Sequence, residues 1–152
     1  MKSIKTRLVK VLAFSLLLAA GNAFAQAQDE VRLLFDRYIQ AENEHNLATV
    51  GQALQDSKDM LWVAPRGSPV WGRDAVMQEL SRVYQGGWKL EPELPALKLT
   101  VYGDNVVRIV VPIRYTVGAA GKPERFLVQH TYVRTPLGWR IAAVVPAPLP
   151  AN

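Results

Sequence analysis

The spacing of the apolar residues changes midway along the chain, and this change restricts the possible fold more than any other feature of the sequence. Before residue 91, apolar residues mostly recur every three or four positions, which is the period of an amphipathic helix. After residue 95 they alternate with polar residues, which is the period of a half-buried strand. Helices followed by strands predict an α+β fold, with the helices packed on one face of an antiparallel sheet.

The front half is expected to contain three helices and one short strand. The first helix is predicted over residues 29–44, and Asn46 is expected to cap a short second helix. A third helix is predicted to begin near Asp74. Before it, the apolar run 60–63 predicts a short strand that ends at the Pro–Gly loop 65–69. The apolar stripe of the first helix consists of Val31, Leu34, Phe35, Tyr38 and Ile39.

The back half is expected to form strands over 97–101, 106–117, 124–135 and 139–145. Proline has no N–H group to donate to a sheet, so Pro112 predicts an edge position or a bulge at which the long second strand bends. A bent strand favours a strongly curved sheet. We therefore expect a cone-like curved antiparallel sheet of about four or five strands, wrapped around the three N-terminal helices.

The first twenty-five residues have the three parts of a secretory signal. Basic residues precede the apolar run 11–20, and Ala23-Phe24-Ala25 follows before Gln26. A run of about ten mostly apolar residues covers half of the ~20 that a membrane-spanning helix needs, so we expect cleavage near Ala25–Gln26 and no membrane insertion of the mature chain. The expected localisation is periplasmic or secreted. We expect a signal peptide over 1–25, one domain over 26–146 and a Pro-rich tail over 147–152.

Charge and composition restrict the partners of the mature chain. The signal segment contains four basic and no acidic residues, so its removal lowers the formal net charge from +5 to +1. This balance gives no reason to expect a nucleic-acid partner. The absence of cysteine excludes disulfides and thiolate metal sites, and His45 and His130 alone provide no metal-ligand spacing. We therefore expect neither a metal nor a cofactor.

Three short segments carry a resemblance to a known family. They are Asp56 to Val63 before the Pro–Gly loop, Gly72 to Val76 at the start of the third helix, and Gly138 to Ile141 at the start of the last strand. In their order and spacing, residues 29–146 resemble the nuclear-transport-factor-2-like superfamily, and in particular its SnoaL-like branch. The resemblance implies a cone with a pocket at its open end, and a homodimer formed through the outer face of the sheet.

The resemblance also directs attention to His130. The isomerase branch of the superfamily has a general-base carboxylate just before the Pro–Gly loop, where this sequence reads Trp62-Val63-Ala64-Pro65 and contains no acid. Steroid-isomerase chemistry is therefore not expected, because proton abstraction needs a base beside the substrate. His130 shares a strand face with Tyr132 and could serve as an acid or base near neutral pH. The simpler alternative is a histidine that is hydrogen-bonded in the core or exposed at a dimer interface.

Aromatic side chains are the candidate ligand-binding residues. They could surround an apolar ligand and orient it with their ring edges and hydroxyls, or they could be ordinary core residues. The candidates are Tyr38, Trp62, Trp71, Tyr115 and Tyr132. Arg108 and Arg114 share a strand face, which is either an anchor for an anionic ligand or a solvated surface.

Three functional hypotheses follow. In the first, the pocket binds a small apolar or amphipathic molecule and lacks a complete catalytic set. In the second, the protein is a cyclase-, isomerase- or hydrolase-like enzyme that uses His130 with a tyrosine hydroxyl. In the third, the domain is a structural dimer or an accessory module of the cell envelope, and its cone is filled by its own side chains.

Overall fold

The computed structural model describes residues 24–118 and 120–150. Most of the expected signal peptide, residues 1–23, lies outside the described residues. None of the helices in the described ranges has the length and hydropathy needed to span a bilayer.

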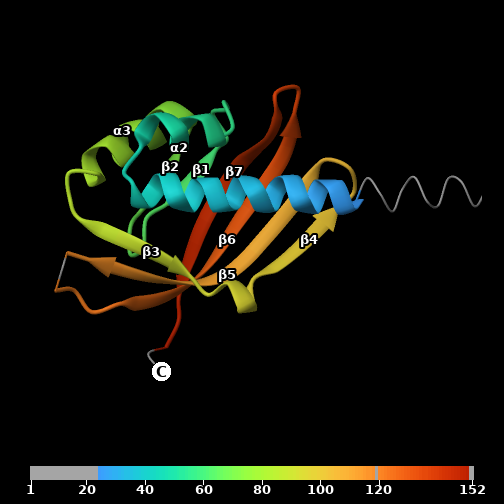
Figure 1. Cartoon of the computed structure of the whole chain (residues 1–152). Coiled ribbons are helices and arrows are strands. Elements are labelled where there is room, and N and C mark those ends of the chain that lie inside the picture. Colours follow the sequence, from blue (N-terminus) through green and yellow to red (C-terminus); the bar gives the residue numbers. More distant parts are fainter. Residues whose placement is uncertain (1–23, 119, 151–152) are drawn as a thin grey trace, which may run out of the picture.

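Three α-helices are present in the described residues, as the sequence predicts. The N-terminal helix covers the described residues 24–43 and crosses the front of the sheet in Figure 1. Helix α2 covers Leu47–Ala53, and its N-cap is Asn46, whose side chain accepts a hydrogen bond from the backbone N–H of Thr49. Helix α3 covers Arg73–Val83 and follows Gly72, whose φ of 86° lies in a region that favours glycine. The two short helices pack together beside the β1–β2 end of the sheet.

The strands of the described ranges form one curved sheet, so the predicted α+β architecture is confirmed, but this sheet has seven strands rather than four or five. Their order is β2-β1-β7-β6-β5-β3, and β4 also pairs with β5. Only the β1–β7 pair is parallel among the described pairs. The strands are β1 Leu61–Val63, β2 Pro69–Trp71, β3 Trp88–Pro92, β4 Lys98–Tyr102, β5 Val106–Val117, β6 Glu124–Thr135 and β7 Gly138–Pro148; the short 3-10 helix η1 covers Leu94–Ala96.

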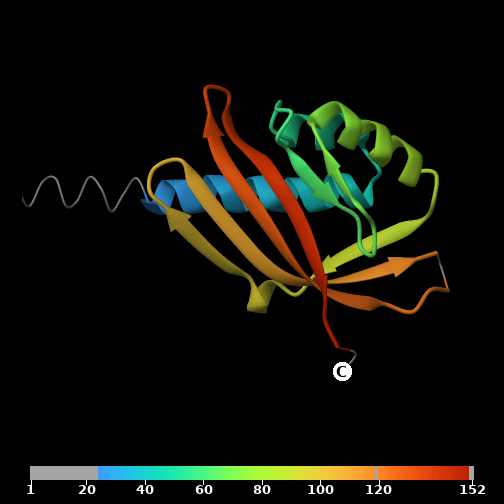
Figure 2. The same ribbon diagram turned by 180° about the vertical axis from the view of Figure 1, so that it is seen from behind.

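Pro112 lies where β5 changes its outer neighbour. The pairing with β4 ends at Val110 and the pairing with β3 begins at Ile113. Between them the carbonyl of Pro112 accepts a hydrogen bond from the backbone N–H of Glu93 at 2.8 Å. In an antiparallel strand the N–H and the carbonyl of one residue point to the same side. The hydrogen bond that Pro112 cannot donate would therefore lie between the ends of β3 and β4, where neither strand is paired with it, so no hydrogen bond of the sheet is lost. Strands β5 and β6 bend here, and their connected ends run beside β3 (Figures 1 and 2).

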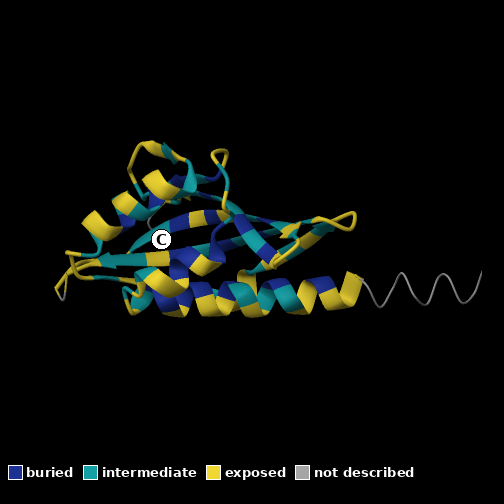
Figure 3. Cartoon of the chain, turned by 90° about the horizontal axis from the view of Figure 1, so that it is seen from above, coloured by how far each residue is buried: buried dark blue, intermediate teal, exposed yellow. Residues whose placement is uncertain are grey.

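The core lies between the N-terminal helix and the inner face of the sheet (Figure 3). Alternate residues of β5 and β6 are buried against the helix, as their period of two predicts. Strand β7 continues this sheet to Pro148, and the N–H of Leu149 still bonds to the carbonyl of Arg125. The chain therefore stays paired with β6 into the segment where the sequence predicted a tail. The buried inner-face residues are Val107, Ile109, Val111, Ile113, Phe126, Val128, His130 and Tyr132.

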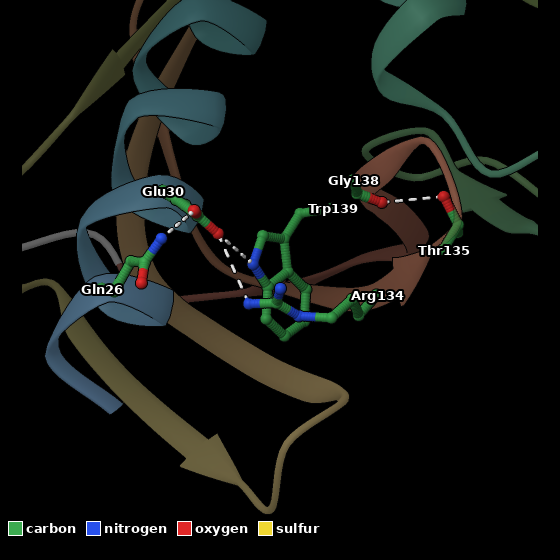
Figure 4. Close-up of polar contacts among 6 residues, drawn as sticks. All are labelled: Gln26, Glu30, Arg134, Thr135, Gly138 and Trp139. Carbon is green, nitrogen blue, oxygen red and sulfur yellow. Dashed lines mark hydrogen bonds and ion pairs between the residues drawn. The ribbon is translucent and has the colours of Figure 1, made fainter. Parts of the chain in front are cut away.

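A polar cluster attaches the start of the N-terminal helix to the β6–β7 hairpin (Figure 4). The indole N–H of Trp139 donates to the Glu30 carboxylate at 2.9 Å, and Arg134 contacts the same oxygen at 3.4 Å. The Arg134 guanidinium also lies 4.8 Å from the centre of the Trp139 ring, within the range of a cation–π contact. Trp139 belongs to one of the three segments that resemble the family, and this cluster gives it a structural role.

Candidate functional site

A small cavity lies between the C-terminal half of the N-terminal helix and the sheet. Its volume is about 50 Å³, well below the roughly 300–1,000 Å³ of most ligand pockets. A ligand must therefore be small, or the surrounding side chains must move. The helix contributes Tyr38, Ile39 and Glu42 to the lining. The other lining residues are Trp62, Val63, Pro65, Trp88, Leu90, Ile113, Val128, His130, Val144 and Pro146.

His130 lines this cavity from the inner face of β6 and is 1% exposed. The rings of Phe35 and Tyr38 meet it edge-on, each with its centroid 5.4 Å away. Its Nδ1 atom lies 3.3 Å from the hydroxyl of Tyr132. Burial lowers the pKa of His130 to about 3, because the apolar surroundings disfavour the charged ring. The neutral imidazole can exchange hydrogen bonds with a ligand, but it is a weak base at neutral pH.

Glu42 also lines the cavity, although the sequence analysis did not select it. The residue is 1% exposed, and its Oε2 atom accepts a hydrogen bond from the Tyr84 hydroxyl at 2.7 Å. Its Oε1 atom is buried without a hydrogen-bond partner among the described residues. Burial raises the pKa of Glu42 to about 7, while the hydroxyls of Tyr38 and Tyr84 favour the carboxylate and limit this rise. A carboxyl group with this pKa can gain or lose a proton near neutral pH.

The sequence itself indicates that Glu42 lies on the buried face of its helix. It lies three residues after Ile39 and four after Tyr38, so it continues the apolar stripe of the N-terminal helix. An acidic residue on the buried face of an amphipathic helix is unusual, because burial of an unpaired charge is costly. A base carboxylate was expected only just before the Pro–Gly loop, so the acid that the helix brings into the pocket was not predicted.

An aromatic cluster borders the Glu42 end of the cavity. The ring of His45 stacks on Tyr84 and Trp88, with centroid distances of 5.0 and 5.4 Å. Tyr115 meets Trp88 edge-on at 5.7 Å. Within the described ranges, the Nε2 atom of His45 and the Nε1 atom of Trp88 are buried without hydrogen-bond partners. Of these two residues, only Trp88 lines the cavity.

Only some of the five aromatic candidates line the cavity. Tyr38 and Trp62 line the cavity. Tyr132 is fully buried beside His130 and is not part of the lining, while Tyr115 is half-buried between Trp88 and Phe126. Trp71 is 58% exposed on β2 and lies outside the cavity. Strand β2 is at the edge of the described sheet, where it pairs with the three-residue strand β1, and this edge position leaves Trp71 on the surface.

The two arginines on β5 are not brought into one site. They are six residues apart along the strand, which corresponds to about 20 Å. The guanidinium of Arg108 lies 5.1 Å from the centre of the Tyr102 ring. Arg114 lines a surface cleft in which two other arginines already pair with Glu93 and Glu124. Within the described residues, no group of three His, Asp or Glu side chains is arranged to hold a metal ion.

Comparison with known proteins agrees with this fold. The SnoaL-like domain family model matches residues 31–145. A putative dehydratase of the nuclear-transport-factor-2-like family from Streptomyces avermitilis is similar with a TM-score of 0.72, at 15% identity over 81% of this chain and 96% of that chain. A nuclear-transport-factor-2-like protein from Salmonella enterica serovar Typhimurium also gives 0.72, at 18% identity over 85% and 94%.

A third structure, a nuclear-transport-factor-2-like protein with a cystatin-like fold from Novosphingobium aromaticivorans, gives a TM-score of 0.71, at 18% identity over 89% of this chain and 90% of that chain. No curated protein matches the sequence. At these identities the solved structures establish the fold alone. The family match covers most of the chain, and it is this match that shows the family. The chain therefore belongs to the SnoaL-like domain family.

Proposed function

We propose that this chain binds a small apolar or amphipathic molecule in the cavity between its N-terminal helix and its sheet, without a complete catalytic set. The observation that supports this proposal is the cavity itself. Apolar side chains supply most of its lining, and Glu42 and His130 provide a few polar atoms beside them. A mostly apolar cavity with a few polar groups is the usual form of a small-molecule site.

A ligand that binds only the folded state should raise the thermal stability of the protein. At a ligand concentration ten times Kd, the expected gain is about 1.4 kcal/mol. Differential scanning fluorimetry against a library of small apolar and amphipathic compounds measures it. Val144→Phe adds bulk to the lining and should abolish the gain. If no compound stabilises the wild-type protein, the pocket does not bind this class of ligand and the structural-module hypothesis gains support.

Acid–base catalysis is the second candidate function, and Glu42 favours it more than His130 does. The Glu42 carboxyl has a pKa of about 7 and lies beside the Tyr84 hydroxyl. His130 has a pKa of about 3, which makes it a poor proton carrier at neutral pH. Proton NMR of each stabilising compound, incubated with the protein for hours, tests this function. Catalysis requires that a compound is converted by the wild-type protein and not by the Glu42→Gln variant.

We also propose that residues 1–25 direct export and are removed near Ala25–Gln26, so that the mature domain starts at Gln26. Signal peptidases require small residues at this kind of site, and Ala23 and Ala25 meet that requirement. Expression in a Gram-negative host should yield a periplasmic protein whose intact mass lacks the first 25 residues. The Ala25→Arg variant should keep them. A full-length wild-type protein in the cytoplasm would contradict export.

We propose that the outer face of the sheet joins two copies of the chain. Figure 2 shows β5, β6 and β7 without a helix over this face. Cross-strand pairing places several apolar residues together there, and Leu127 is 37% exposed. A second copy would bury this patch and contribute hydrophobic free energy. The apolar patch consists of Val110, Pro112, Leu127, Val145 and Ala147.

Sedimentation velocity at micromolar concentration should show a dimer of the mature chain. The variant Leu127→Glu should weaken it at least ~10-fold, because it places an unpaired charge in the interface. Leu137→Glu is the matched control, since Leu137 is 80% exposed at the β6–β7 turn and away from this patch. A monomeric wild-type protein, or equal effects of the two variants, would argue against the proposed interface.

A further inference from the structure

Two unpartnered polar atoms belong to residues that line the cavity. Oε1 of Glu42 and Nε1 of Trp88 are both buried, and neither has a hydrogen-bond partner among the described residues. Buried polar atoms without partners are rare in native proteins, because each loses its hydrogen bonds to water. Such an atom on a residue that lines a cavity is a candidate hydrogen-bond partner for a bound molecule.

The fold holds these two residues close to each other. The side-chain amide of Asn43, next to Glu42, donates to the Leu90 carbonyl at 2.9 Å and accepts from the Leu90 N–H at 2.7 Å. These two bonds fasten β3, which contains Trp88, to the end of the N-terminal helix. The ring of Trp88 lies 5.7 Å from that of Tyr84, whose hydroxyl donates to Glu42.

The chemistry of the two free atoms is complementary. The indole N–H of Trp88 can only donate a hydrogen bond, and an ionised Glu42 carboxylate can only accept one. The second oxygen of Glu42 accepts the Tyr84 hydrogen bond, and the Tyr38 hydroxyl lies near enough to favour the charged carboxylate without forming a hydrogen bond of normal geometry to Oε1. No ion pair of Glu42 is found among the described residues, so the carboxylate is not neutralised by a cation of the described chain.

We infer that Glu42 and Trp88 recognise a neutral ligand whose polar end both donates and accepts a hydrogen bond, as a small alcohol or primary amide does, while its hydrocarbon part contacts the apolar lining. This inference rests on the proposed binding function and adds the ligand's chemical class to it. A protonated amine would satisfy Glu42 and leave the Trp88 N–H without an acceptor. A ketone would satisfy Trp88 and leave an ionised Glu42 without a donor.

Four ring compounds of similar size separate these possibilities: cyclopentanol, cyclopentanone, cyclopentylamine and methylcyclopentane. At pH 8, where Glu42 is mostly ionised, cyclopentanol should bind about 10-fold more tightly than the other three, because each lost hydrogen bond leaves a buried group unpaired. ¹H–¹⁵N NMR of the tryptophan indoles measures the binding. The Trp88 signal should shift, while the Trp139 signal, whose N–H bonds to Glu30, should stay in place.

Two substitutions test the recognition separately from the fold. Trp88→Phe removes the donor and keeps an aromatic ring, and Glu42→Leu removes the acceptor. Each should lower the affinity for cyclopentanol about 10-fold and leave that for methylcyclopentane unchanged or higher. Trp71→Phe, at an exposed tryptophan outside the cavity, is the control. A purely structural role of either residue would change all four affinities alike.

The possible failures are distinguishable. If methylcyclopentane binds as tightly as cyclopentanol, or if Trp88→Phe leaves the affinity for cyclopentanol unchanged, the recognition inference is wrong while pocket binding stands. If cyclopentylamine binds most tightly, the site recognises cations and the inference is also wrong. If none of the four compounds binds, both the inference and the proposed binding of small apolar ligands fail.

Discussion

Acidification from pH 6.5 to pH 3.5 should lower the free energy of unfolding by about 4 kcal/mol through His130. The ordinary pKa of histidine is 6.5, and burial lowers that of His130 to about 3 in the folded protein. Between these values the unfolded chain binds a proton that the folded protein does not. Stability therefore rises with pH across this window and is lost as the pH falls. Above pH 6.5 the ring is neutral in both states, so the effect ends there.

The variant His130→Gln tests this expectation, because glutamine does not titrate and can still form hydrogen bonds. Urea unfolding, followed by tryptophan fluorescence at pH 7, 5 and 3.5, gives the free energy at each pH. The fall on acidification should be smaller in the variant by about 4 kcal/mol. The variant His45→Gln keeps His130 and should retain the loss. If His130→Gln and the wild-type protein have parallel pH profiles, His130 does not titrate as its burial requires.

Raising the pH should destabilise the protein through Glu42, by about 3 kcal/mol in total. The pKa of this carboxyl rises from an ordinary 4.5 to about 7 on folding. Between the two values the folded protein holds a proton that the unfolded chain has released. The Glu42 contribution is therefore complete below pH 4.5, falls as the pH rises through 7, and is absent above it.

The effects of Glu42 and His130 oppose each other between pH 4.5 and 6.5, so Glu42 is best measured in a His130→Gln background. There, Glu42→Gln should remove most of the fall in stability between pH 4.5 and pH 8. The amide oxygen can still accept the Tyr84 hydrogen bond. Glu44→Gln changes an exposed acid near the same end of the helix and should leave the fall in place. An equal fall in the Glu42→Gln and Glu44→Gln variants would show that Glu42 is not its source.

The long elements of this fold are visible in the sequence. The predicted strands 106–117 and 124–135 coincide with β5 and β6, because each buries one face and therefore alternates. Pro112 indicates the bend because proline cannot donate to a ladder. Strands β2 and β3 were not predicted; both are short, and they include Pro69 and Pro92. Their pairing depends on backbone groups that distant segments bring beside them, and this leaves little local pattern.

The residues of the candidate site were likewise predicted only in part. Alternation along β6 places His130 on the inner face, and helical spacing places Tyr38 on the buried side of its helix. Trp71 was expected in the pocket because it is aromatic, yet its strand leaves it exposed. Glu42 continues the helical stripe, but its role depends on Tyr84, which lies 42 residues away and donates its hydrogen bond.

The residue pattern alone determined the α+β class, the long strands and the bend at Pro112. Each of these follows from a local rule, either the period of burial or the lack of a donor. The tertiary structure decided which side chains share one small cavity, that a helix provides its carboxyl group, and which polar atoms remain without partners. These features depend on contacts between segments far apart in the chain, where burial and neighbouring groups set each pKa and each unmet hydrogen bond.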